Sequence, residues 1–268
     1  MAVDANSSFI TWVLYILQSS WPLFLRGAQV TLIISLSGTI IGFLIGVLIG
    51  IIRTIPIDHN TNLFKRIVLK IIDYFLLCYI EVFRGTPMMV QAMVIFYGSA
   101  MIYGIRMSPI FAGVFIVSIN TGAYMAEIVR GGIISIDKGQ FEASHAIGMT
   151  HAQTMISIVL PQAIRNILPA LSNEFVINIK DTSVLNVIGV TELYFQSNSA
   201  AGNNFRYFEV FLITCIIYFI MTFTVTRILR YFEAKLEGPS VYTIHGSQTV
   251  PEAEIKISTG SKKNGKNH

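Results

Sequence analysis

Charged side chains are scarce in this sequence. Only 13% of its 268 residues are Asp, Glu, Lys or Arg, about half of the roughly 25% that soluble domains carry. This scarcity excludes a disordered protein and an ordinary cytosolic enzyme. The two cysteines, Cys78 and Cys215, lie apart in apolar runs, which excludes a disulfide-rich domain and gives no metal or redox spacing. No basic residue opens the chain, so we expect no signal peptide.

Apolar residues take the place of the missing charge. They make up 53% of the chain, and the mean hydropathy is +0.62. Residues 27–52 contain no charge, and as a helix they extend about 39 Å, enough for a tilted membrane crossing. The pattern predicts an all-α polytopic membrane protein with five spans, at 24–52, 67–101, 108–130, 166–190 and 208–232. The lipid bilayer is then its solvent, and the net charge of +4 suggests no nucleic-acid partner.

The distribution of basic residues predicts the orientation. If the N-terminus is outside, the outer segments hold only Arg26, Arg106 and Arg206. The cytoplasmic segments then hold fourteen: Arg53, Lys65, Arg66, Lys70, Arg130, Lys138, Arg165, Arg227, Arg230, Lys235, Lys256, Lys262, Lys263 and Lys266. Because positive charge gathers on the cytoplasmic side, we expect the N-terminus outside and the C-terminus inside.

We divide the chain into an external segment 1–23, a transmembrane domain 24–237 with a cytoplasmic loop 139–165, and a polar, disordered cytoplasmic tail 238–268.

Small and polar residues in the spans indicate how the helices pack. Glycines at 38, 42, 46 and 50 share one face of the first span, where another helix can approach closely. Two polar stripes follow the same logic: Asn120, Tyr124 and Glu127 in the third span, and Glu174, Asn178 and Asp181 in the fourth. With Lys180 and Arg84, they are candidate substrate contacts, because ionisable groups in spans face a bundle interior or a water-filled path. The alternative is that these charges only pair with each other.

The loop between the third and fourth spans predicts a docking element. Residues 140–147 suit a short helix, and Gly148 permits a sharp turn after it. Thr150 can cap a second short helix that runs to about Val159. Pro161 then ends that helix or begins the next. Two short helices at an angle on the cytoplasmic face suit the groove of a partner protein.

Several segments of the sequence resemble one family, the ABC-importer permeases with an EAA motif, and within it the polar-amino-acid subgroup. The loop carries Glu142, Ala143 and Ser144, then Gly148, and then Leu160 with Pro161. The other similar segments are Phe83 to Pro87 with Gln91 after it, Ala123 to Ile133, Gly139 to Met149, and Lys180 to Leu193. The resemblance covers about residues 24–237. Ser144 stands where the family usually has a second alanine, and we expect it to be small and exposed, so that docking is retained.

The resemblance implies the type I ABC-importer fold in a bacterial cytoplasmic membrane. It implies a second permease subunit, identical or paralogous, two ATPase subunits that hold ATP and Mg, and an external amino-acid-binding protein. This chain would hold no cofactor, metal or catalytic residue. In the coupling loop, Glu142 would be the charged anchor, Gly148 the turn, and Leu160 with Pro161 the exit, and Gln140, Ala143 and Ser144 belong to the same loop. The fourth-span charges Glu174, Lys180 and Asp181 would contact a zwitterion, and we assign the nearby Ser183 to that path.

Two other classes of protein remain as alternatives. A secondary transporter or channel would need no ATPase, but five spans cannot form a complete inverted repeat, and the docking loop would have no purpose. An intramembrane enzyme would need clustered catalytic groups. The histidines instead lie far apart and form no H-E-x-x-H pattern: His59, His145, His151, His245 and His268.

Overall fold

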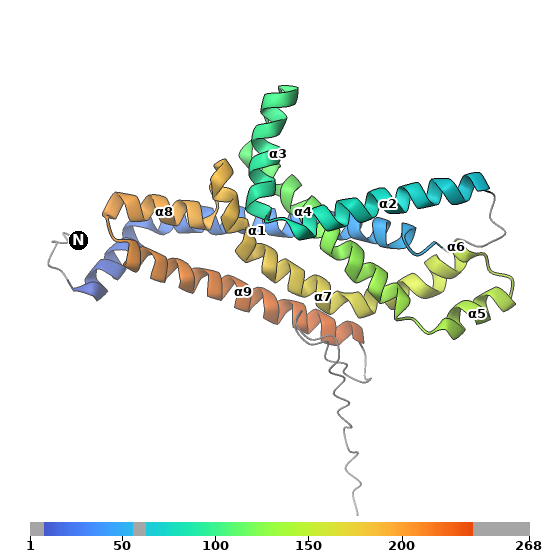
Figure 1. Cartoon of the computed structure of the whole chain (residues 1–268). Helices are drawn as coiled ribbons and strands as arrows, with labels where there is room; N and C mark the ends of the chain where they lie inside the picture. The colour runs from blue at the N-terminus through green and yellow to red at the C-terminus, as the bar shows by residue number, and fades with distance from the viewer. Residues whose placement is uncertain (1–7, 56–62, 238–268) are drawn as a thin grey trace, which may run out of the picture.

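The computed structural model describes residues 8–55 and 63–237, and these residues are helical without any strand (Figure 1). The helices in order are α1 (Phe9–Ile52), α2 (Leu63–Gly85), α3 (Met88–Tyr103), α4 (Pro109–Ile134), α5 (Lys138–Ala146), α6 (His151–Thr154), α7 (Leu160–Asp181), α8 (Leu193–Asn204) and α9 (Tyr207–Glu237). A π-helical turn, Met155–Val159, joins α6 to α7, and a 3-10 turn, Thr182–Ile188, follows α7. The all-α prediction is confirmed for this part of the chain. The predicted tail 238–268 lies outside the described residues.

Four of the described helices are long and apolar enough to cross a membrane: Phe9–Ile52, Pro109–Ile134, His151–Ile188 and Tyr207–Lys235. Helix α3, Met88–Tyr103, is a shorter apolar helix. The prediction of a protein that crosses the membrane several times is confirmed. Several boundaries differ from the expected spans, and the span expected at 166–190 lies in a helical segment that already begins at His151. Helix α1 begins at Phe9 instead of residue 24, because Ser8 caps it and the helix continues through Pro22 for 44 residues.

The expected single span 67–101 is two helices. Helix α2 ends at Gly85, and α3 begins at Met88 after Pro87, which has the extended backbone of an N-cap. A residue before proline avoids the α conformation, so α2 cannot continue through Thr86 and ends at Gly85. Helix α3 then leaves the direction of α2, and its far end projects beyond the other helices (Figure 1), while its first turns pack against α4 and the 3-10 turn.

Helices α1 and α4 pack closely along the predicted glycine face. An added Cβ would lie 2.4–2.7 Å from an α4 atom at each position. The pairs are Gly38 with Val117, Gly42 with Thr121, Gly46 with Met125, and Gly50 with Val129. Because the residue numbers rise together, the two helices run parallel. The predicted packing face is confirmed, and only glycine permits this approach.

Helix α8 was not predicted, and a buried carboxylate holds it in place. Glu192 has no exposed surface. Its carboxylate accepts the backbone N–H groups of Tyr194 and Phe195, each at 2.7 Å, and the Tyr218 hydroxyl at 3.0 Å. Glu192 therefore caps α8 and ties it to α9. This helix lies at the opposite end of the molecule from α5 and α6 (Figure 1).

Candidate functional site

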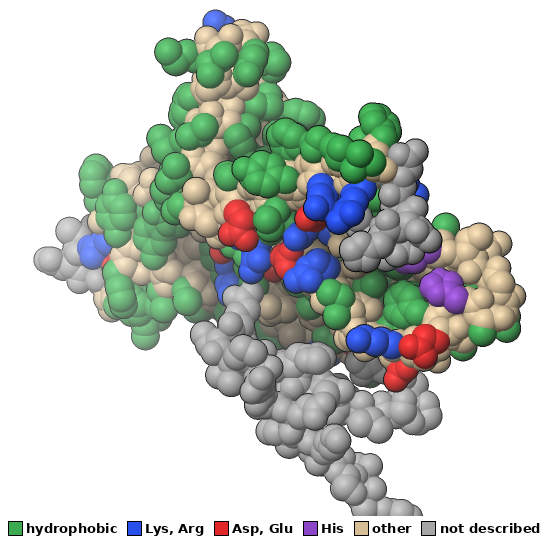
Figure 2. Space-filling model, turned by 45° about the vertical axis from the view of Figure 1, so that its right-hand side comes forward, with side chains coloured by type: hydrophobic (Ala, Val, Ile, Leu, Met, Phe, Trp, Pro, Cys, Tyr) green, Lys and Arg blue, Asp and Glu red, His purple; other side chains and the backbone are tan. Residues whose placement is uncertain are grey.

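A cavity of about 1070 Å³ lies between α2, α4 and α7. Both predicted polar stripes contribute to its wall, Tyr124 and Glu127 from α4 and Glu174 from α7. Arg84 from the end of α2 and Lys180 from the end of α7 also line it. Figure 2 shows acidic and basic side chains gathered on one face of a surface that is otherwise largely hydrophobic. The cavity therefore presents both signs of charge inside a membrane protein.

The charges of this cavity are not neutralised by one another. Glu174 is 5% exposed. The Arg84 guanidinium lies 5.6 Å from the centre of the Tyr124 ring, in a cation–π contact. Within residues 8–55 and 63–237, no ion pair includes Arg84, Glu174 or Lys180. The alternative that the intramembrane charges only pair with each other is therefore not supported for these three groups.

Other predicted path residues have different surroundings. Asn178 is buried, and its amide donates to the hydroxyls of Thr39 at 2.8 Å and Thr121 at 2.9 Å. This side chain joins α7 to α1 and α4, so it serves helix packing instead of facing the cavity. Asp181 and Ser183 are not among the residues that line the cavity. The predicted polar stripe of α7 is thus divided between the cavity and the helix interface.

Asn120 and Gln91 close the break between α2 and α3. The Gln91 amide donates to the carbonyl oxygens of Phe83 and Thr86, each at 2.9 Å. Its oxygen accepts the Asn120 amide at 2.9 Å. Asn120 is therefore occupied by this network and does not line the cavity. A glutamine four residues after Pro87 is the sequence signal for this role. Gln91 was part of the family resemblance, but its contacts were not predicted.

An ion-pair cluster fixes one end of the cavity wall. Arg130 bonds Glu127 at 2.9 Å, as their spacing of three residues predicts. Arg53, at the end of α1, also contacts Glu127, and it bonds Asp73 of α2 at 3.0 Å. The sequence reasoning missed Arg53 and Asp73, because they come from helices that only the fold brings together. Glu127 lines the cavity while it holds α1, α2 and α4 in place.

The predicted docking loop has the expected elbow. Helix α5 covers Lys138–Ala146, and Gly148 follows with φ of +83°, a conformation that favours glycine. Thr150 caps α6 in a capping box with Gln153. Pro161 is the second residue of α7, and the helical backbone runs into it without a break through the π-helical turn. We expected Pro161 to end a second short helix at about Val159 or to begin the next helix. The prediction of a separate short helix is wrong, because one unbroken helical segment runs from His151 through Pro161 into α7.

Ser144 is a correction within this loop. We expected an exposed side chain, but Ser144 is only 1% exposed. Its hydroxyl accepts from Thr154 at 2.9 Å and donates to the Phe141 carbonyl at 2.8 Å. Ser144 thus fastens α5 to α6. The outer surface of the elbow is formed instead by exposed residues such as Glu142 and Ile147, the latter 77% exposed.

Comparisons with known proteins point to one family. Residues 66–238 match the family described as "Binding-protein-dependent transport system inner membrane component". The chain is 39% identical over 217 residues to the glutamine transport system permease protein GlnP of Escherichia coli (strain K12), covering 81% of this chain and 94% of the relative. It is 36% identical over 160 residues to the arginine transport system permease protein ArtQ of Bacillus subtilis (strain 168), covering 60% and 73%.

Solved structures agree with this match. The crystal structure of an amino acid ABC transporter with histidines superimposes with a TM-score of 0.69 at 38% identity, covering 88% of this chain and 100% of that chain. The inward-facing MetNI methionine ABC transporter gives a TM-score of 0.60 at 20% identity, covering 78% and 95%, and shows the fold alone.

Proposed function

Because the chain belongs to the family of binding-protein-dependent transport system inner membrane components, and is the permease subunit of an ABC importer, we propose that its cargo is a polar amino acid. The observation that carries this proposal is the cavity whose lining includes Arg84 of α2 with Glu174 and Lys180 of α7. A zwitterion offers a carboxylate to the two cations and an ammonium group to Glu174. Names of relatives that specify glutamine and arginine transport support the same class of cargo.

The loop 139–165 is, in our proposal, the coupling element. Exposed Glu142 and Ile147 give it a charged and an apolar contact, a combination suited to the groove of an ATPase subunit. The excess of basic residues supports a cytoplasmic position for this loop, with the N-terminus outside. Closure of the ATPases would move α5 and α6, and the continuous helix from His151 would carry that movement into α7.

The remaining components of the transporter follow from this role. We propose a second permease subunit, identical or paralogous, two ATPase subunits that hold ATP and Mg, and an external amino-acid-binding protein. This chain then provides the path and the coupling and carries no catalytic step. The assembly would lie in a bacterial cytoplasmic membrane.

The test is transport by the assembled importer in proteoliposomes. Glu174→Gln and Lys180→Met each remove a charge-assisted hydrogen bond, so uptake should fall about tenfold or more, while assembly and basal ATP hydrolysis persist. Glu81→Gln and Lys70→Met change the same residue types on α2, away from the cavity lining, and should transport normally. Unchanged uptake by both cavity variants would remove these residues from the path. Uptake that continues without ATP would favour a secondary transporter or channel.

A further inference from the structure

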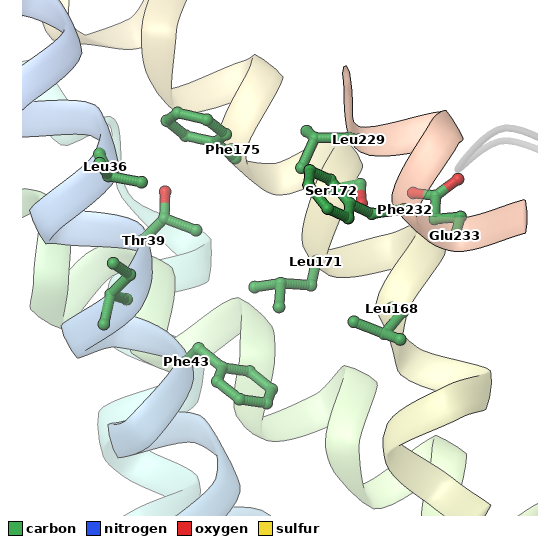
Figure 3. A pocket seen from close by; sticks show the side chains of 11 residues that line it. Leu36, Thr39, Phe43, Leu168, Leu171, Ser172, Phe175, Leu229, Phe232 and Glu233 are labelled. Atoms are coloured by element: carbon green, nitrogen blue, oxygen red, sulfur yellow. The ribbon is translucent and has the colours of Figure 1, made fainter. Parts of the chain in front are cut away.

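A second hollow lies on the other side of α7 from the charged cavity. It has a volume of about 210 Å³ and is enclosed by α1, α7 and α9 (Figure 3). Its wall includes Leu36 and Phe43 of α1, Leu171 and Phe175 of α7, and Leu229 and Phe232 of α9. Glu174 and Ile177 of α7 line the charged cavity instead. Since successive helical residues are about 100° apart, the two hollows lie on opposite faces of α7.

This apolar pocket suits hydrocarbon and not water. Thr39, Ser172 and Glu233 are the polar residues of its lining, and the Thr39 hydroxyl accepts the Asn178 amide at 2.8 Å. The remaining lining residues are apolar, and a largely apolar wall favours hydrocarbon over water. Its three helices all belong to segments long and apolar enough to span a membrane. Beside it, α1 and α9 expose large apolar side chains such as Leu44 and Ile228. An acyl chain of the surrounding bilayer can therefore reach the pocket.

A polar hollow of about 240 Å³ adjoins the apolar pocket and shares Ser172, Leu229 and Glu233 with it. Arg230, Thr226 and Asn173 also line it. Within residues 8–55 and 63–237, neither Arg230 nor Glu233 takes part in an ion pair. The hollow thus presents one positive and one negative group at the mouth of a hydrocarbon-lined pocket.

We propose that the two hollows form one binding site for a phospholipid whose head group carries a primary ammonium, such as phosphatidylethanolamine. One acyl chain fills the pocket between α1, α7 and α9. The Arg230 guanidinium binds the phosphate, because guanidinium groups match phosphate oxygens. The Glu233 carboxylate accepts from the ammonium group. An anionic head group would bring no ammonium group to the Glu233 carboxylate, and a choline head group has no N–H to donate.

The acyl part of the site is tested by photolabelling. The full-length chain is placed in nanodiscs of phosphatidylethanolamine and phosphatidylglycerol, doped with phosphatidylethanolamine that carries a diazirine on one acyl chain. We expect labelled peptides from residues 36–43 and 168–175. Leu171→Trp fills the pocket and should reduce this label about tenfold, whereas Leu25→Trp, at an exposed position of α1 outside the pocket lining, should leave it unchanged. Equal labelling in both variants would overturn the proposal.

The head-group part is tested by competition between unlabelled lipids. Arg230→Gln should weaken phosphatidylethanolamine binding about tenfold, and Glu233→Gln should abolish its preference over phosphatidylglycerol. Arg227→Gln is the matched control, because this guanidinium lies 4.9 Å from the centre of the Phe223 ring and lines neither hollow.

An equal loss in Arg227→Gln would indicate a nonspecific basic surface, and equal competition by phosphatidylcholine would exclude the ammonium contact. Loss of the label when the chain is assembled with a second permease would show that the wall is a subunit interface. Each of these three results would refute the proposed site.

Discussion

Gly46 is the point of closest approach between α1 and α4, and alanine at this position should separate the two helices. The new Cβ would lie 2.4 Å from the Met125 Cβ and 2.9 Å from the backbone nitrogen of Ala126. Backbone atoms cannot turn aside as a flexible side chain can. The helices would have to move apart by about 1 Å, since ordinary contacts begin at 3.4 Å.

The energetic cost follows from this geometry. Overpacking of a tight interface costs about 1–3 kcal/mol. Separation of α1 from α4 also strains the bonds from Asn178 to Thr39 and Thr121, and interhelical hydrogen bonds in membranes contribute about 0.6 kcal/mol each. We expect Gly46→Ala to lower the unfolding free energy by about 2–3 kcal/mol, and the melting temperature by about 5 °C or more.

The assay is the melting temperature of the full-length chain in detergent, followed by fluorescence-detected size-exclusion chromatography. Gly98→Ala is the matched control, because this glycine lies in α3 with nothing within 4 Å of an added Cβ. Alanine is the better helix former, so this variant should melt at or above the wild-type temperature. If Gly46→Ala melts no lower than Gly98→Ala, the close packing of α1 on α4 is refuted.

Three further predictions concern the loop and the helix break. Gly148→Val forces a β-branched residue into a φ of +83°, at a cost of about 1–2 kcal/mol. This variant and the single variant Glu142→Lys should each abolish copurification of the ATPase while membrane insertion persists. Retention of the ATPase by both variants would contradict the coupling role. Thr154→Val removes the bond to Ser144, worth about 1 kcal/mol, and should speed hydrogen exchange of the α5 amides; unchanged exchange would deny that this bond fastens the loop. Gln91→Leu removes the side-chain donor of the Thr86 carbonyl and leaves the Phe83 carbonyl with the longer bond from Asn120, at 3.3 Å. It should therefore lower the melting temperature by more than the exposed Met93→Leu does in the same helix.

Much of the architecture was predictable because it repeats along one helix. The four glycines share a face by spacing alone, and Gly148 followed by Thr150 marks the elbow through local backbone chemistry. Both signals depend only on near neighbours in the chain. The same holds for the pair of Glu127 and Arg130, three residues apart.

The missed features depend on residues that the fold brings together. Helix α8 is held by Glu192, whose partners include Tyr218 from another helix. Asn178 was placed on a substrate path because its helix face was known, but Thr39 and Thr121 approach that face from α1 and α4. Pro87 marks the break in the second span, yet the apolar residues on both sides give a continuous hydropathy signal.

The hydroxyl pair of Ser144 and Thr154 also constrains how this loop can change over generations. Alanine at position 144 would leave the fully buried Thr154 hydroxyl without its acceptor. In a permease with alanine at position 144, the loop should therefore be more stable with a residue that has no hydroxyl, such as valine, at position 154. The two positions should therefore be inherited as a matched pair. A loop transplanted between related importers should work best when both residues come from the same parent.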